Sequence, residues 1–306
     1  MSVPAELSRI AVPPALGASA EPASRGLWRD ALARLSRDRL TIAAAAIVAV
    51  CVVLALLADI IASTLGVSAT QVDLPHRFQG PSSAHWLGTD EFGRDQLARL
   101  LQGARVSLGV ASSAALINLV LGVSLGTTAA MYGGIADDVF TWLVNTMRSI
   151  PSLFLLLIIA ALFRVGPAGL AVIIGLTSWM GPARLVRGQA LETKASEYIT
   201  SARAVGAPEL RIMLRHVLPN LVPIISVLVG IDVGQAILRE SALSYLGLGV
   251  QPPDASWGNM LTNAQAYFSR GPWLVIAPGA AITLIVWCLY AIGDGLRDAL
   301  DPRLAP

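Results

Sequence analysis

Six long apolar stretches constrain what this chain can fold into more than any other feature. Each is close to the roughly 20 residues that a helix needs to cross the hydrocarbon core of a bilayer. They lie near residues 41–62, 106–131, 139–163, 168–187, 219–242 and 273–293. None alternates with a period of two, which disfavours a β-barrel. With 55% hydrophobic and only 14% charged residues, the chain is predicted to be an all-α polytopic membrane protein with six transmembrane helices.

The basic residues are divided unequally between the two sets of connections, and this division predicts the orientation. With the N-terminus in the cytoplasm, fourteen basic residues lie inside and six outside, while Arg148 and Arg239 lie within spans. The inside set is Arg9, Arg25, Arg29, Arg34, Arg37, Arg39, Arg184, Arg187, Lys194, Arg203, Arg211, Arg215, Arg297 and Arg303. The outside set is Arg77, Arg94, Arg99, Arg105, Arg164 and Arg270. Both termini are therefore expected to be cytoplasmic.

The same pattern predicts the division of the chain. Residues 1–24 are rich in Ala, Pro and Ser and are expected to form a disordered cytoplasmic tail. The first apolar run begins near Leu40, too late for a secretory signal peptide. The remaining segments are 25–62, an amphipathic helix and the first transmembrane helix; 63–105, an extracytoplasmic loop; 106–296, a core transmembrane domain with an inner loop at 188–218; and 297–306, a cytoplasmic tail.

A basic amphipathic helix is expected on the inner membrane surface before the first span. Leu27, Trp28, Ala31, Leu32 and Leu35 recur at helical spacing among arginines. The pattern is equally consistent with a first span that simply extends inward.

The inner loop between the fourth and fifth spans has the pattern of a short helix. Good helix formers run from Glu197 to Val205, Gly206 suits the C-terminal stop, and Pro219 suits the first turn of the next span. The small side chains of Ser201, Ala202 and Ala204 would let another surface approach closely. The loop therefore predicts a docking element.

This loop resembles the EAA loop of bacterial ABC importer permeases. The matching positions are Thr200, Ser201, Ala202, Gly206, His216, Leu218 and Pro219. Thr200 stands where the family usually has Glu and Ser201 where it has the first Ala, so the carboxylate that could pair with the ATPase is missing. The resemblance assigns coupling to the ATPase to Glu197, Tyr198, Thr200, Ser201, Ala202, Arg203, Gly206 and Ala207.

Further motifs resemble the second permease subunit of the peptide and nickel branch of this superfamily. They occupy residues 85–90, 93–95, 103–108, 131–134, 183–189, 240–249, 257–261 and 293–298, and the resemblance runs from about Leu27 to Arg303. It implies the fold of a type I ABC importer permease in the bacterial inner (plasma) membrane. The implied cargo is a dipeptide or oligopeptide, with nickel chelates and haem as alternatives.

The resemblance also implies the partners. They are a homologous second permease subunit in a heterodimer, cytoplasmic ABC ATPase subunits and an extracytoplasmic substrate-binding protein, besides the lipid bilayer. The chain contains no Gly-x-x-x-x-Gly-Lys-Ser/Thr phosphate loop, so ATP and Mg are expected to be bound by the partner subunits and no cofactor by this chain. Neither enzymatic activity nor nucleic-acid binding is expected.

Polar residues within the spans are the candidates for the translocation path. Asp232, Gln235 and Arg239 share one face of the fifth span with Glu240 to its side, and Asn145 lies in the third span. Charged residues at this depth should face protein or water. An internal Asp232–Arg239 pair, contacts with the partner permease, and a packing hydrogen bond from Asn145 are the structural alternatives.

Three further features carry structural expectations. Gly122 and Gly126 predict close helix packing, which the sequence assigns to no particular partner. Pro151 and Pro182 predict kinks or breaks. The outer loop contains His and acidic residues whose spacing matches no metal-ligand template, so we expect them to set turns: His76, His85, Asp90, Glu91 and Asp95.

Two other function classes fit the sequence poorly. A membrane-embedded hydrolase would need paired carboxylates, a zinc motif or a Ser/His pair, but Asp232 and Glu240 are eight residues apart and no span contains His. A secondary carrier that works alone is disfavoured by six spans without an inverted repeat and by the large inner loop.

Overall fold

The computed structural model describes residues 27–163 and 165–300, and within these ranges the regular secondary structure is helical, apart from one isolated bridge between Thr89 and Asp95. The expected tail at 1–24 and residues 301–306 lie outside this part of the chain. The first half contains α1 (Leu27–Leu35), α2 (Arg39–Leu56), α3 (Ala58–Leu65), α4 (Gln96–Tyr132), α5 (Gly134–Ser149) and α6 (Ser152–Leu162). The second half contains α7 (Pro167–Ser178), α8 (Met180–Lys194), α9 (Glu197–Ala204), α10 (Glu209–Ile212), α11 (Leu218–Tyr245), α12 (Ala264–Tyr267) and α13 (Trp273–Leu300).

Four helical segments of the described chain are each long and apolar enough to cross a membrane alone: Arg39–Leu56, Gln96–Tyr132, Glu209–Tyr245 and Trp273–Leu300. Two further pairs pass the same test only together, because α5 and α6 are bent by 80° and α7 and α8 by 45°. The number of crossings is therefore four to six. The expected six are reached if each bent pair forms one crossing.

The two bends occur where the prolines predicted them. Ile150, which precedes Pro151, is extended at φ −90° and ψ 125°, because the proline ring disfavours a helical conformation for the residue before it. The second bend is at Trp179, just before Pro182 in the first turn of α8. The ring of Pro182 would clash with the carbonyl of Ser178 in an unbroken helix.

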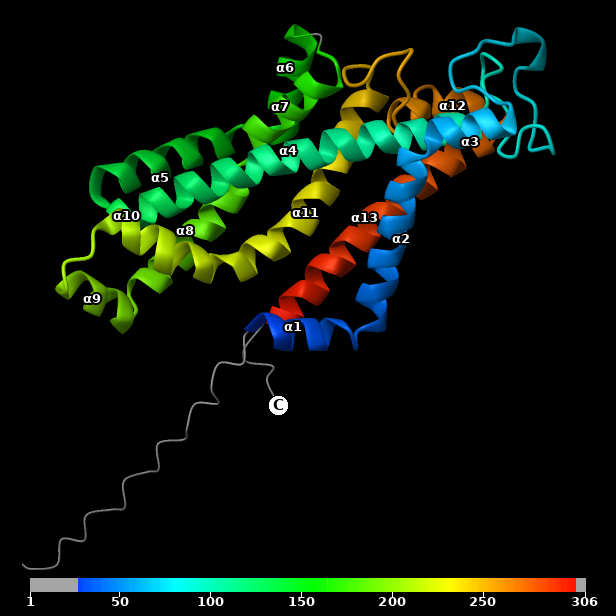
Figure 1. The fold of residues 1–306 in the computed structure, drawn as a ribbon. Coiled ribbons are helices and arrows are strands. Elements are labelled where there is room, and N and C mark those ends of the chain that lie inside the picture. The colour runs from blue at the N-terminus through cyan, green and yellow to red at the C-terminus, as the bar shows by residue number, and fades with distance from the viewer. Residues whose placement is uncertain (1–26, 164, 301–306) are drawn as a thin grey trace, which may run out of the picture.

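Helix α1 is separate from the first long helix, contrary to the reading in which the first span simply extends inward. Asp38 caps α2, and its carboxylate accepts hydrogen bonds from the Leu40 amide at 3.0 Å and from the Thr41 hydroxyl. The chain turns at Ser36 and Arg37, and α1 packs across one end of α13 (Figure 1). The first span therefore does not extend through α1.

Helix α4 organises the bundle. It begins at Gln96, well before the expected start near residue 106, and it packs along α7, α8 and α11. Arg105, assigned to the outer loop, lies within α4 and donates hydrogen bonds to the Ala55 and Leu56 carbonyls at 3.0 Å each. It also pairs with Asp59 at 2.8 Å. Helices α2 and α13 lie side by side beyond α11 (Figure 1).

The glycine pair of α4 packs inside this subunit, against α8. A Cβ at Gly122 would lie 3.0 Å from the Cβ of Pro182 and 3.1 Å from the amide nitrogen of Ala183. A Cβ at Gly126 would collide with the Ala183 carbonyl oxygen and lie 3.2 Å from the amide nitrogen of Arg187. The close packing that the two glycines predicted is confirmed, and its partner is α8.

Gly126→Val should destabilise the protein. Because the nearest atoms belong to the backbone of α8, the helices must separate, and overpacking of this kind lowers the free energy of unfolding by about 1–3 kcal/mol. Thermal unfolding of the detergent-solubilised protein measures the change. Gly109→Val is the matched control, since a Cβ at Gly109 in the same helix meets no atom within 4 Å. Equal shifts in both variants would contradict the packing argument.

Candidate functional site

Helix α9 begins at the predicted residue, Glu197, and ends one residue before the predicted Val205. It spans Glu197–Ala204 and ends in a turn in which Gly206 adopts φ +84°, a left-handed conformation that favours glycine. The Gly206 amide donates to the Arg203 carbonyl at 2.9 Å, and the Ala207 amide donates to the Ala202 carbonyl at 3.1 Å. These bonds satisfy carbonyl groups at the end of the helix. Gly206 is therefore the predicted stop.

One apolar side chain anchors α9 to the bundle. Ile199 is fully buried in a cluster that also contains Val186 of α8, Leu221 of α11 and Met131 of α4. Such a side chain, removed from water, typically contributes about 1.5–3 kcal/mol to docking of the helix. This apolar cluster therefore connects α9 to α4, α8 and α11.

Polar contacts fix the orientation of α9. The Arg203 guanidinium donates two hydrogen bonds to the Glu209 carboxylate, at 2.7 and 3.1 Å, and this pairing raises the pKa of Arg203 above its ordinary value. Both side chains are about one third exposed, so the pair contributes less than about 1 kcal/mol. The Asn220 amide donates to the Tyr198 hydroxyl at 3.3 Å.

The rest of α9 and its turn faces solvent. Glu197, Thr200, Ser201 and Gly206 are exposed, as is nearly half of Tyr198; Ala202, Arg203 and Ala207 are half-buried. Exposed apolar side chains follow in the sequence, namely Val205, Leu210 and Leu214. All the residues named in this paragraph are together called the α9 surface below. It combines small, polar and apolar side chains.

Two contacts made by basic residues of α8 were not assigned a role by the sequence. The Arg187 guanidinium donates two hydrogen bonds of 2.5 Å to the Asp137 carboxylate, linking α8 to α5. The Lys194 ammonium donates to the carbonyls of Ala130 and Met131, at 2.8 and 2.7 Å, and thereby caps α4. The sequence signal was only that basic residues gather near the ends of predicted spans.

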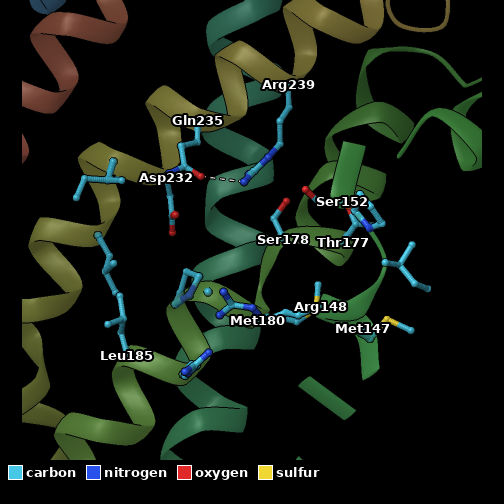
Figure 2. A pocket seen from close by; sticks show the side chains of 17 residues that line it. Met147, Arg148, Ser152, Thr177, Ser178, Met180, Leu185, Asp232, Gln235 and Arg239 are labelled. Atoms are coloured by element: carbon cyan, nitrogen blue, oxygen red, sulfur yellow. Dashed lines mark hydrogen bonds between the residues drawn. The ribbon is translucent and has the colours of Figure 1, made fainter. Parts of the chain in front are cut away.

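A cavity of about 770 Å³ lies where the two bends face α11. Figure 2 shows Asp232, Gln235 and Arg239 on one side and Ser152, Thr177 and Ser178 on the other. Arg239 donates to the Gln235 side-chain oxygen at 2.8 Å. The ion pairs of the described residues include none between Asp232 and Arg239 within 4 Å. The predicted common face of α11 thus lines the cavity.

The other two path candidates lie elsewhere. Glu240 is fully buried and accepts hydrogen bonds from Ser107 at 2.9 Å and Ser244 at 2.7 Å. The Ser107 hydroxyl in turn accepts from the Trp257 amide at 3.1 Å, so Glu240 holds α11, α4 and the loop at residue 257 together. Asn145 is exposed on α5 and is not among the residues that line the cavity.

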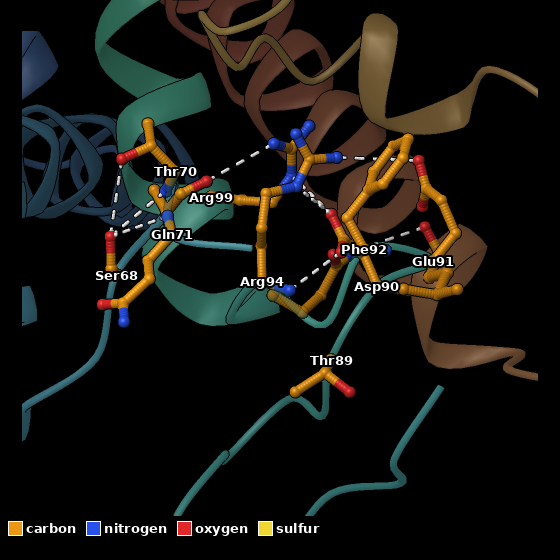
Figure 3. A network of polar contacts seen from close by, with 12 residues as sticks. Ser68, Thr70, Gln71, Thr89, Asp90, Glu91, Phe92, Arg94 and Arg99 are labelled. Carbon is orange, nitrogen blue, oxygen red and sulfur yellow. Dashed lines mark hydrogen bonds and ion pairs between the residues drawn. The ribbon is translucent and has the colours of Figure 1, made fainter. Parts of the chain in front are cut away.

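The outer connection is organised by a buried ionic cluster, shown in Figure 3. Asp90 accepts from the Arg94 Nε at 2.7 Å, and the Arg99 Nε lies 3.3 Å from the same oxygen. Asp95 caps α4 at the Ala98 amide and contacts the His85 ring at 2.9 Å. In the part of the chain that the structure describes, no three His, Cys, Asp or Glu residues form a group that could hold a metal ion.

Two family models match this sequence. Residues 119–306 match the family described as binding-protein-dependent transport system inner membrane component. Residues 26–81 match the N-terminal transmembrane domain of oligopeptide transport permease C. The first match covers more than half of the chain, and together they extend over most of the length on which the motif resemblance was based.

Individual relatives align over nearly their whole length. The dipeptide transport system permease protein DppC of Alkalihalophilus pseudofirmus is 37% identical over 277 residues, which are 90% of this chain and 90% of that protein. The oligopeptide transport system permease protein OppC of Bacillus subtilis is 34% identical over 92% of this chain and 91% of its own. The glutathione transport system permease protein GsiD of Pectobacterium atrosepticum is 37% identical over 90% of this chain and 91% of its own length. The resemblance is confirmed, and the chain belongs to the family of binding-protein-dependent transport system inner membrane components.

Proposed function

We propose that this chain is a permease subunit of an ABC importer and forms half of the translocation path for a dipeptide or oligopeptide. The observation that carries the proposal is α9, a short helix at one end of the bundle with an exposed surface and a buried anchor, Ile199. Relatives named as dipeptide, oligopeptide and glutathione permeases support a peptide cargo.

In this proposal the chain crosses the membrane six times, each bent pair forming one crossing, with both termini and α9 in the cytoplasm. The α9 surface binds a cytoplasmic ABC ATPase subunit, which holds ATP and Mg. An extracytoplasmic binding protein delivers the peptide at the end that carries the outer connection. A homologous second permease subunit closes the open side of the cavity, so that Asp232, Gln235 and Arg239 face the path.

The contacts of α9 suggest how ATP hydrolysis moves the path. When the ATPases close, they pull α9, whose Ile199 belongs to an apolar cluster that also contains side chains of α4, α8 and α11. Helices α8 and α11 both line the cavity. A shift of α9 therefore opens the cavity toward one side of the membrane or the other.

Reconstitution tests this function. Proteoliposomes that contain this chain with its second permease, the ATPases and the binding protein should accumulate a labelled dipeptide only when ATP is supplied. Omitting the ATPases, or replacing ATP by a non-hydrolysable analogue, should abolish the uptake. Uptake by this chain alone, driven by an ion gradient, would show a secondary carrier and refute the proposal.

A further inference from the structure

Among the residues that line the cavity, Asp232 carries a buried side-chain oxygen without a hydrogen-bond partner. Its residue is only 5% exposed, and its Oδ2 atom has no hydrogen-bond partner. Buried carboxylates normally accept hydrogen bonds or pair with a cation, because an unpaired buried charge is costly. Asp232 lines the cavity and points into it in Figure 2. None of the ion pairs of the described residues involves Asp232, so a positively charged group that enters the cavity can pair with this carboxylate.

Guanidinium groups line the same cavity. Arg239 lies on the face of α11 that carries Asp232, and Arg148 and Arg184 come from the facing helices. Gln235 accepts one hydrogen bond from Arg239, but a guanidinium has five N–H donors in a planar arrangement that fits a carboxylate. Most donors of Arg239 are thus available to an anionic group.

The separation of the two charges fits a short peptide. Asp232 and Arg239 are seven positions apart, which at 1.5 Å per residue is roughly 10 Å along the helix. Arg239 reaches back toward Gln235, so its charge lies nearer to Asp232 than its backbone does. An extended chain spans about 3.3–3.6 Å per residue, so the ends of a dipeptide lie roughly 7 Å apart.

We propose that Asp232 binds the α-ammonium group of a short peptide and Arg239 its α-carboxylate, so that the permease itself recognises both ends of the cargo. This inference rests on the proposed function and names the chemistry that its cavity selects. The Asp232–Gln235–Arg239 face acts as a subsite for a zwitterion, and blocking either end of the peptide removes one of the two contacts.

Direct binding tests the subsite without the binding protein. The purified complex of both permeases and the ATPases is titrated with dialanine, N-acetyl-dialanine and dialanine amide, and binding is followed by ligand-observed NMR. Loss of one charge-assisted contact should weaken binding about tenfold. We expect that loss for N-acetyl-dialanine in the wild type and no difference between dialanine and N-acetyl-dialanine in Asp232→Asn. Arg239→Gln should instead abolish the preference for dialanine over its amide.

Asp138→Asn is the matched control, because Asp138 is exposed on α5 and does not line the cavity. It should keep both preferences. Should Asp232→Asn prevent assembly of the complex, Arg239→Gln decides the question on its own. Equal weakening of all three ligands in the variants, or no binding of dialanine to the wild type, overturns the subsite. ATP-dependent uptake through the binding protein would still stand in that case, so the proposed function fails or survives separately.

Discussion

Gly206→Asp should reduce peptide uptake by the reconstituted transporter at least tenfold while the partner ATPases continue to hydrolyse ATP. Gly206 ends α9 at φ +84°, is exposed, and has no atom within 4 Å of an added Cβ. The side chain would therefore fit the free subunit and project toward the ATPase. An unpaired charge that loses water at an interface costs several kcal/mol, and about 1.4 kcal/mol is already tenfold in binding.

Two further substitutions separate charge from backbone strain at this position. Gly206→Asn has nearly the shape of Asp without the charge, and Asn tolerates the left-handed conformation, so most uptake should remain. Gly206→Val opposes the conformation itself and should lower both the thermal stability and the uptake. Uptake, ATP hydrolysis and co-purification of the ATPases are measured for each variant. Normal coupled uptake in Gly206→Asp would show that α9 does not bind the ATPase.

The elements that the sequence predicted are those that local chemistry determines. Apolar runs predicted the long helices because a helix satisfies its own backbone hydrogen bonds within a bilayer. Pro151 and Pro182 predicted the bends because a proline ring restricts the residue before it and clashes with the carbonyl four residues before it. Gly206 predicted the end of α9 because few residues other than glycine adopt a left-handed backbone conformation. Each of these effects acts within a few residues and can be recognised in a single sequence.

The polar groups show where this reasoning ends. At 100° per residue, Arg239 lies about 20° from Asp232 around the helix axis and Glu240 about 80° from it. Helical periodicity therefore placed Glu240 to the side of the cavity face. It could not predict the hydrogen bond of Glu240 with Ser107 of α4, which is 133 residues away in the sequence. Asn145 could not be placed either, because its position depends on the 80° bend between α5 and α6. The start of α4 was missed because Arg99 and Arg105 were read as loop residues, whereas tertiary contacts with Asp90 and α2 accommodate them.

Asp90→Asn should strongly destabilise the outer connection. Asp90 is 3% exposed, and one carboxylate oxygen contacts both Arg94 and Arg99. The other accepts hydrogen bonds from the Phe92 and Arg94 amides at 2.9 Å each. Asn preserves the shape but leaves two buried guanidinium groups without this counter-charge. Removing one partner of a buried ion pair typically costs about 3–5 kcal/mol.

Asp73→Asn provides the comparison, because Asp73 lies in the same connection and pairs with His76, yet its side chain is 48% exposed. Exposed pairs contribute at most about 1 kcal/mol, so this variant should unfold at nearly the wild-type temperature. Thermal unfolding in detergent and protease cleavage of the outer connection report the two changes. Because the ion pairs of the described residues leave Arg94 only Glu91, at 3.6 Å, cleavage should increase in Asp90→Asn and stay unchanged in Asp73→Asn. Equal behaviour of the two variants would mean that apolar packing, and not the Asp90 cluster, holds the outer connection against α4.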